Sequence, residues 1–354
     1  MKYRPISYEH YNPVPYGEQK RFTAPVPACA IASMSWTASE AIDVAMNHKI
    51  VLADAIATCY GYVFDNNGRL IVGATHKLRE RRNYPRWIKR GPFVRPHPIF
   101  PRLENYRETV AVLTASTQKI YFHWLLDILP RIGMLADTGE KADLMYIQRK
   151  YRFQKESLEM LGIGEQQIIN TVDVAAMTAK KIVVPCHQIM NGREIPPWVI
   201  QYLRDQFLTT AAKSPAPPYR RVYISRRSAD RRLKNERDII TKLRHYGFIS
   251  VELEKLPFQE QIQLFRHAQV IISPHGSGLA NLVFSAPGTT VIELFPAANL
   301  DLFYRLSTAL KLNYFFVKAH DGNPTQLVRD DYAINWEDLK ETLDMIAIPP
   351  CPSP

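Results

Sequence analysis

The sequence predicts an α/β protein made of two Rossmann-like domains, with parallel sheets that face each other across a cleft. Strand-length apolar runs alternate with helix-length amphipathic segments along most of the chain, a pattern typical of parallel sheets covered by helices. The proline-rich stretch AAKSPAPPYR, residues 211–220, separates two such series and predicts a hinge. With 354 residues, the chain is long enough for two domains of roughly 150 residues each.

The first series predicts a domain over residues 49–212, after an N-terminal arm, residues 1–48, without a sustained hydrophobic period. Residues 59–74 alternate in period two around the turn Asn66-Asn67-Gly68, which predicts a hairpin. Further elements are predicted at 109–116 (strand), 118–137 (a helix kinked by Pro130), 143–148 (strand), 153–163 (a helix closed by Gly162), 166–171 (strand) and 180–185 (strand).

The second series predicts a domain over residues 213–330, followed by a C-terminal helix and tail, residues 331–354. Asn235 is expected to cap a helix that ends at Gly247, and Pro257 to lie near the start of the next helix. Its elements are predicted at 221–225 (strand), 235–247 (helix), 248–254 (strand), 257–269 (helix), 270–273 (strand), 277–286 (helix), 289–296 (strand), 314–319 (strand) and 335–346 (helix).

The excess of basic over acidic residues in the chain indicates an anionic partner. The formal net charge is +11 and the isoelectric point is near 9.4, which suits nucleic acid, a membrane surface or a phosphorylated ligand. Basic clusters lie at residues 77–90 and 219–237. The arginines of the second cluster follow a predicted strand instead of one helix face, and no nucleic-acid-binding module is recognisable, so we expect no nucleic-acid partner. A nucleic-acid-binding protein is the less favoured alternative. Peripheral membrane association through residues 77–90 is a hypothesis.

Segment hydropathy and cysteine spacing predict a cytoplasmic chain, or one held peripherally at the inner face of a membrane. The first residues have no apolar core of the secretory type, and no apolar run approaches the roughly 20 residues needed to span a bilayer. The four cysteines lie far apart, so neither a disulfide framework nor a zinc ribbon is expected.

The segment VIISPHGSGLANLVFSAPGTTVIELFP, residues 270–296, predicts a phosphate-binding site. A strand leads directly into His275-Gly276-Ser277-Gly278 and a helix follows, so backbone N–H groups can approach an anion at a helix terminus. Asn281 replaces the third glycine of the dinucleotide fingerprint, and a tight turn without a ligand is the alternative. Glu293, at the end of the next strand, could accept hydrogen bonds from a ribose.

A second group of cations follows the strand at 221–225. Arg226 comes directly after it, and Arg231, Arg232 and Lys234 precede the next helix. Guanidinium groups there can hold phosphate oxygens bidentately and neutralise a leaving diphosphate. The chain contains no D-x-D pair of carboxylates, so we expect neither a metal nor any cofactor besides a nucleotide-sugar substrate.

His123 and Asp127 are ionisable residues within an apolar helical stripe, four residues apart and therefore on one face. A hydrogen-bonded core pair is one interpretation. Because the helix follows a predicted strand, its first residues lie at the carboxyl edge of the sheet, and either residue could be a general base. Arg131, one turn later, could meet a phosphate or cap the helix after the kink.

Four ordered motifs carry a family resemblance: HWLLDILPR, YISR, RRLKNE and PHGSGLAN. Over roughly residues 105–300 the chain resembles glycosyltransferase family 61, which includes capsular-polysaccharide enzymes, xylan transferases and extracellular O-linked N-acetylglucosamine transferases. The resemblance implies a GT-B fold, an inverting mechanism and a nucleotide-sugar donor on the C-terminal domain. It implies donor-side roles for Arg226, Asn235, Glu236, His275, Gly276, Gly278, Asn281 and Glu293.

The predicted function is therefore transfer of a hexosyl, pentosyl or N-acetylhexosaminyl group from a nucleotide sugar, UDP being the commonest nucleotide of the family. The acceptor is expected to be a glycan or lipid-linked glycan in capsular or extracellular polysaccharide synthesis. Asn235 and Glu236 could equally be a helix cap and a first-turn acid. A catalytically inactive GT-B protein that binds a sugar nucleotide or a glycan is the alternative class.

Overall fold

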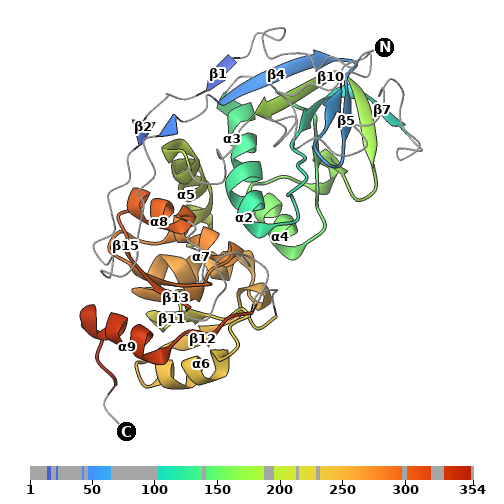
Figure 1. Cartoon of the computed structure of the whole chain (residues 1–354). Coiled ribbons are helices and arrows are strands. Elements are labelled where there is room, and N and C mark those ends of the chain that lie inside the picture. The colour runs from blue at the N-terminus through green and yellow to red at the C-terminus, as the bar shows by residue number, and fades with distance from the viewer. Residues whose placement is uncertain are drawn as a thin grey trace, which may run out of the picture. The chain divides into compact units, whose positions relative to one another are not determined.

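The computed structural model describes residues 14–16, 21–22, 42–43, 47–64, 103–137, 141–186, 195–212, 215–228, 232–296, 301–319 and 331–351. The chain divides into two compact units, each with its own sheet (Figure 1). Unit 1 comprises residues 1–20 and 43–190, and unit 2 comprises 21–42 and 191–354. The domain boundaries given above stay a prediction. The hairpin expected at Asn66-Asn67-Gly68, the basic cluster 77–90 and Arg231 lie outside the described residues.

Unit 1 contains a mixed sheet with the order β1-β4-β10-β7-β8-β9, on which β5 pairs with β10 and β6 with β5. Strands β10 and β7, β7 and β8, and β8 and β9 pair in parallel, as the alternating pattern predicted. The remaining strands pair antiparallel, so the sheet is mixed. Its strands are β1 (Val14–Tyr16), β4 (Asn47–Ala53), β5 (Ile56–Thr58), β6 (Val63–Phe64), β7 (Leu103–Val112), β8 (Leu144–Ile147), β9 (Ile168–Asn170) and β10 (Ala176–Cys186).

The helix predicted at residues 118–137 is interrupted by a π turn. It consists of α2 (Tyr121–His123), the π segment η4 (Trp124–Ile128) and α3 (Leu129–Asp137). In η4 the backbone N–H of Leu129 donates to the carbonyl of Trp124, five residues earlier. Pro130 comes next and has no N–H, so the regular ladder is already broken there. The helix α4 (Arg152–Met160) follows β8, and Gly162 after it has φ +74°, as expected for a helix end.

Unit 2 contains a five-stranded, entirely parallel sheet with the order β12-β11-β13-β14-β15. Numbered along the unit this order is 2-1-3-4-5, so its topological switch point lies between β11 and β13. Its elements are α5 (Pro197–Ala211), β11 (Arg221–Ile224), α6 (Glu236–Arg244), β12 (Ile249–Val251), α7 (Phe258–His267), β13 (Val270–Pro274), η8 (Ser277–Phe284), β14 (Thr290–Phe295), α8 (Leu302–Ala309), β15 (Asn313–Lys318) and α9 (Trp336–Met345).

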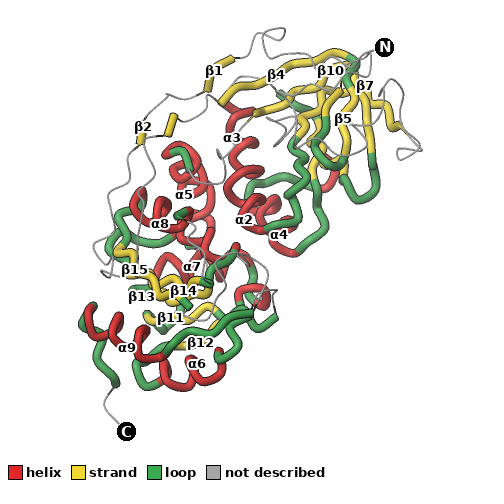
Figure 2. Tube along the Cα trace, viewed as in Figure 1, coloured by secondary structure: helices red, strands yellow, loops and turns green. Residues whose placement is uncertain are grey.

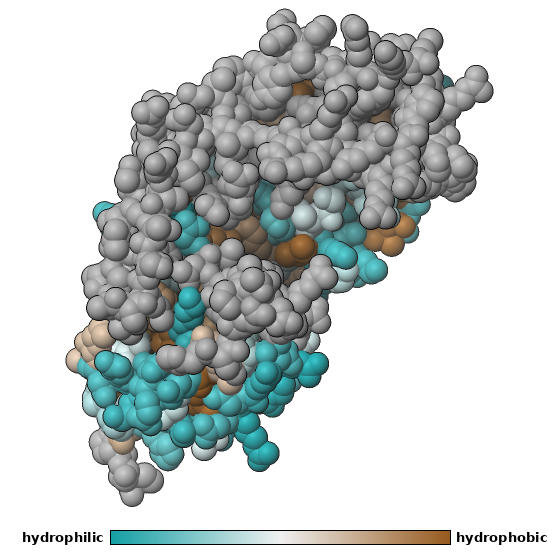
Figure 3. Space-filling model, viewed as in Figure 1, coloured by the Kyte–Doolittle hydropathy of each residue, from teal (hydrophilic) through white to brown (hydrophobic). Residues whose placement is uncertain are grey.

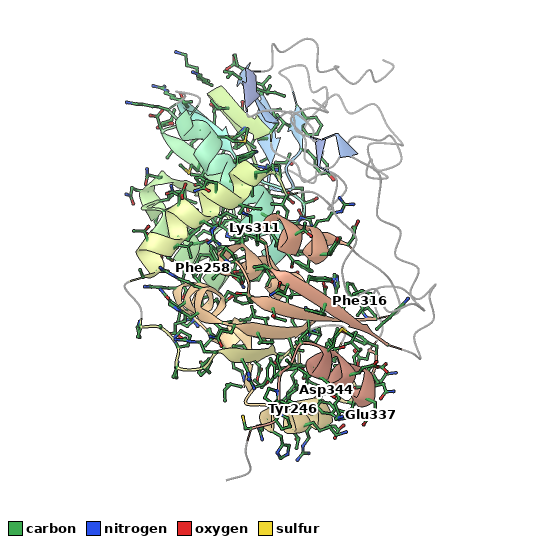
Figure 4. The ribbon with its side chains drawn as sticks, turned by 90° about the vertical axis from the view of Figure 1, so that its left-hand side faces the viewer. Tyr246, Phe258, Lys311, Phe316, Glu337 and Asp344 are labelled. Carbon is green, nitrogen blue, oxygen red and sulfur yellow. The ribbon has the colours of Figure 1, made fainter. Side chains whose placement is uncertain are left out.

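Helices cover both faces of this sheet. Helices α6 and α9 lie on one face, and α5, α7 and α8 lie on the other (Figure 2). On the first face, buried side chains of α6 and α9 form one apolar cluster with those of the strands. Figure 4 labels Tyr246, Glu337 and Asp344 on that side and Phe258 on the opposite side. The visible outer surface over α6 and α9 is mostly hydrophilic (Figure 3), so their apolar residues face inward.

Three local predictions for unit 2 need correction. Helices α5 and α8 were not predicted at all. The segment after β13 is a 3₁₀ helix, η8, instead of an α-helix. Asn235 precedes α6, but its side chain does not cap the helix; it exchanges two hydrogen bonds with the backbone of Ile334, at 2.7 and 3.2 Å. This contact ties the segment before α9 to the start of α6.

Candidate active site

Arg226 and Gly276 meet where two neighbouring strands end. Arg226 lies two residues after β11 and Gly276 two residues after β13, and these strands pair in the sheet. A methyl group on Gly276 would overlap Nη1 of Arg226, so the guanidinium lies against the backbone of this glycine. With φ 171° and ψ 173°, Gly276 has extended backbone that any residue can adopt. A larger residue at this position would therefore have to displace the guanidinium of Arg226.

Glu236 holds the loop that carries Arg226. Its side chain is buried, and Oε1 accepts hydrogen bonds from the hydroxyl of Tyr223 at 3.1 Å and from the backbone N–H of Arg226 at 3.0 Å. Burial, with Glu236 adding to it, raises the pKa of Tyr223 well above its ordinary value, so the hydroxyl stays a proton donor. Glu236, the residue expected on the donor side, thus fixes the backbone of Arg226.

His275 and Glu293 form a buried pair at the ends of β13 and β14. Nδ1 of His275 lies 2.5 Å from Oε1 of Glu293, and the hydroxyl of Tyr314 donates to Oε2 at 2.6 Å. The His275 ring is stacked on Phe295, with centroids 5.4 Å apart. Both oxygens of Glu293 are thus engaged within the protein, and the side chain is fully buried. Its predicted contact with a ribose is untested. Tyr314 was not predicted, and no local spacing identifies it.

The other predicted donor-side residues surround this site in different ways. Ser277 is partly exposed at the start of η8. A Cβ on Gly278 would lie 2.8 Å from Cδ1 of Leu253, so this glycine allows close packing. Asn281 is buried and donates to the Gln261 side chain at 3.1 Å. Lys234 is exposed, and its backbone N–H donates to the carbonyl of Tyr332.

The second candidate cluster lies in unit 1. Nδ1 of His123 lies 2.5 Å from Oδ2 of Asp127, across the junction of α2 and η4. Asp127 is 1% exposed, whereas the His123 side chain is 16% exposed. The pair predicted from the sequence is therefore formed, with the carboxylate inside and the imidazole nearer the surface. Sections of π-helix recur at functional sites, and here one carries the carboxylate.

Arg131 extends this cluster into the interior. The side chain is buried, and burial lowers the pKa of the Arg131 guanidinium while the charge of Asp127 acts in the opposite direction. Burial also raises the pKa of the Cys186 thiol to about 12, with Arg131 opposing the shift. The Asp127 carboxylate thus interacts with the charge of Arg131 and contacts the imidazole of His123, which fixes the ring.

Within the ranges that the structure describes, no three His, Cys, Asp or Glu side chains come together as a set of metal ligands would. Within the same ranges no helix is both long and apolar enough to cross a membrane.

The doubly wound sheet of unit 2, with basic and glycine residues at its switch point, is typical of a Rossmann-like ligand-binding fold. The family model described as Glycosyltransferase 61 matches residues 121–292, a range that includes the cluster of unit 1, Arg226 and His275 and ends one residue before Glu293. This part of the chain therefore matches glycosyltransferase family 61, the family that the four motifs resemble.

Three curated relatives share part of this region. The EGF domain-specific O-linked N-acetylglucosamine transferase of Drosophila melanogaster is 33% identical over 86 residues, which is 23% of this chain and 16% of the relative. The protein O-linked-mannose β-1,4-N-acetylglucosaminyltransferase 2 of Tetraodon nigroviridis is 28% identical over 128 residues, 34% of this chain and 22% of the relative. The mouse protein of the same name is 30% identical over 80 residues, 22% and 14% respectively. The match thus spans less than a quarter of each relative.

The predicted cytoplasmic location is wrong. The relatives act in the lumen of the endoplasmic reticulum or in extracellular compartments, not in the cytoplasm. The prediction used segment hydropathy and cysteine spacing, which report on membrane spanning and disulfide formation. Neither property specifies the compartment in which a chain works.

Proposed function

We propose that this protein is an inverting glycosyltransferase that moves a sugar from a nucleotide-sugar donor to a hydroxyl of a glycan or glycoconjugate, without a divalent metal ion. The observation that carries the proposal is the guanidinium of Arg226 packed against Gly276 at the switch point of the parallel sheet, inside a region that matches family 61. Ligands of open parallel sheets bind at such points.

Unit 2 is assigned to the donor. The Arg226 guanidinium can hold two phosphate oxygens at once, and the first backbone N–H groups of η8 begin directly after Gly276. These groups supply positive charge and hydrogen-bond donors to the diphosphate as it leaves. They perform the task that a divalent cation performs in other transferases, which supports chemistry without a metal.

Unit 1 is assigned to the acceptor, the division of labour of a GT-B enzyme. Asp127 is buried and holds Nδ1 of His123, and the imidazole is the more exposed member of the pair. We therefore choose His123 as the base and Asp127 as its positioning partner. The acceptor oxygen attacks the anomeric carbon and its proton passes to Nε2. The bond from that carbon to the diphosphate oxygen breaks, and the diphosphate leaves with the electron pair.

The named relatives favour N-acetylglucosamine as the sugar and an O-linked glycoprotein as the acceptor. We propose UDP-N-acetylglucosamine as the first donor to test. Capsular or extracellular polysaccharide, the acceptor class that the sequence resemblance implied, is the second arm of the acceptor panel.

The test is release of UDP from UDP-N-acetylglucosamine, with and without an acceptor panel, in the presence of a metal chelator. The panel contains O-linked glycopeptides and polysaccharide oligosaccharides. We expect acceptor-dependent release that His123→Ala abolishes. Binding of UDP-N-acetylglucosamine without turnover on any acceptor of the panel would contradict the enzyme assignment and support a non-catalytic binding protein.

A further inference from the structure

Glu293 is a fully buried carboxylate that two side chains share. Oε1 faces Nδ1 of His275 at 2.5 Å, and Oε2 accepts the hydroxyl proton of Tyr314 at 2.6 Å. Burying a carboxylate costs free energy unless it is hydrogen-bonded and paired. Glu293 lies on β14, Tyr314 lies on β15, and His275 directly follows β13. Three adjacent strands therefore hold these residues in place.

The His275 ring has little freedom to turn. Phe295 stacks on one side with an interplanar angle of 21°, and Phe303 of α8 lies 5.5 Å away between centroids. Because Nδ1 faces Glu293, Nε2 is the nitrogen available to a ligand, and no residue in the described part of the chain is assigned to it. His275 directly precedes Gly276, against which the Arg226 guanidinium lies. Nε2 and this guanidinium belong to the same strand-end site.

We propose that Tyr314, acting through Glu293, is a positioning residue that sets His275 to donate a hydrogen bond to the diphosphate of the donor. This inference rests on the proposed function. A phosphate oxygen can only accept hydrogen bonds, so Nε2 must carry a proton to bind it. The Glu293 carboxylate faces Nδ1 of the ring through Oε1, and the hydroxyl of Tyr314 donates to Oε2. Tyr314 thereby holds the carboxylate in the position from which it orients the ring.

The charged groups around the ring support this reading. Glu293 is the carboxylate that faces it from β14, and the Arg226 guanidinium approaches the adjacent glycine from the loop after β11. From α8 the ring meets an apolar side chain, Phe303, and the buried Arg305 of that helix is paired with Asp301 at 2.9 Å. Glu293 is thus the partner through which a substitution at Tyr314 can act.

The experiment measures nucleoside diphosphate affinity against pH, between about pH 5 and 8 where an imidazole titrates. UDP, GDP and CDP serve as probes, by calorimetry, on the wild type, Tyr314→Phe and Glu293→Gln. The phosphates of the probe titrate in the same range, so differences between variants carry the result. Tyr332→Phe is the matched control, because the Tyr332 hydroxyl donates at 2.8 Å to the carbonyl of Leu294, the residue next to Glu293. It removes a buried tyrosine hydroxyl without touching the carboxylate.

We expect Glu293→Gln and Tyr314→Phe each to change the pH profile of binding relative to the wild type, because each removes a hydrogen bond through which the ring is held. Affinity near neutral pH should fall about tenfold in Glu293→Gln, the loss expected for one hydrogen bond to a charged group. Tyr332→Phe should follow the wild type.

Three outcomes would contradict these expectations in different ways. Absence of binding to the wild type by every probe overturns the proposed function itself. Binding by the wild type with the same pH profile in Tyr314→Phe overturns only the positioning role. An equal shift in Tyr332→Phe also overturns it, because the effect would then be a general response of the strand. Thermal unfolding of each variant verifies that it is folded at the temperature of the titration.

Discussion

The two histidine–carboxylate pairs of this protein have the same contact distance and different origins. In unit 1, Nδ1 of His123 lies 2.5 Å from Asp127, four residues later in the same helical segment. In unit 2, Nδ1 of His275 lies 2.5 Å from Glu293, 18 residues away on the neighbouring strand. The first pair follows from helix periodicity alone. The second requires the parallel register of β13 and β14, in which Ser273 lies opposite Glu293.

The pairs also differ in the solvent exposure of the histidine and in the other groups that interact with the carboxylate. The His123 side chain is 16% exposed and that of His275 8%, while both carboxylates are buried. Glu293 carries a second hydrogen bond from Tyr314, and Asp127 feels the buried guanidinium of Arg131. We therefore assign proton transfer to the more exposed pair, His123 and Asp127, and ligand binding to His275 and Glu293.

The largest expected effect is on turnover. His123→Ala should lower kcat for sugar transfer by about 10²–10⁴-fold, the usual contribution of a general base, and leave nucleotide affinity within about twofold. Steady-state kinetics and calorimetry on the same preparation measure both. His245→Ala, an exposed histidine that follows α6, is the control. A loss of nucleotide affinity as large as the loss of kcat in His123→Ala would contradict this assignment of catalysis and ligand binding to separate pairs.

A smaller effect is expected on the stability of unit 1. Asp127→Asn should lower the free energy of unfolding by about 3 kcal/mol, because the charge of Arg131 then stays buried without its compensating carboxylate. Arg131→Met in the Asp127→Asn background should recover part of the loss. Urea denaturation of the two single variants and the double variant measures the coupling. Strict additivity would show that Asp127 does not compensate Arg131.

The next effect concerns space at the donor site. Gly276→Ala should weaken nucleoside diphosphate binding about fivefold to tenfold, because the new methyl group displaces the guanidinium of Arg226. The backbone at this position is extended, so the substitution should cost little stability. In the Arg226→Ala background the same change should have almost no further effect. A full additional loss there would mean that the methyl group acts on the ligand directly.

The smallest effect tests how closed the surroundings of Arg131 are. Burial raises the pKa of the Cys186 thiol to about 12, so its thiolate is scarce at neutral pH and the native protein should resist iodoacetamide there. Cys351 is exposed and serves as the internal reference. Peptide mass spectrometry after alkylation should find Cys186 modified only in unfolded protein. Native modification at the rate of Cys351 would contradict the buried setting.

Local patterns predicted much of the fold and the unit 1 pair. The strands of unit 2 and the ends of α4 and α6 at Gly162 and Gly247 have short-range signals, and both glycines have φ +74°. His123 and Asp127 were recognisable because helix periodicity brings them together. Signals of this kind depend on residues that are close together in the sequence.

Features that depend on distant residues were missed. Tyr314 becomes significant only once β15 lies beside β14. Asn235 has the sequence context of a helix cap, yet the backbone of Ile334, 99 residues later, takes its side chain instead. The antiparallel strands that extend the unit 1 sheet depend equally on long-range pairing. Periodicity cannot report such contacts, because the competing partner is supplied by the folded structure.

Unit 2 is proposed to bind a nucleoside diphosphate through Arg226 without a metal ion. Calorimetric titration of the wild type and Arg226→Ala with UDP, GDP, CMP and CDP, each with and without a divalent cation, tests it most directly. One diphosphate should bind equally well in both conditions, and Arg226→Ala should weaken its binding by about 10–100-fold, as expected for a charge-assisted bidentate contact. Equal binding by wild type and Arg226→Ala, or binding only with the cation, would contradict it.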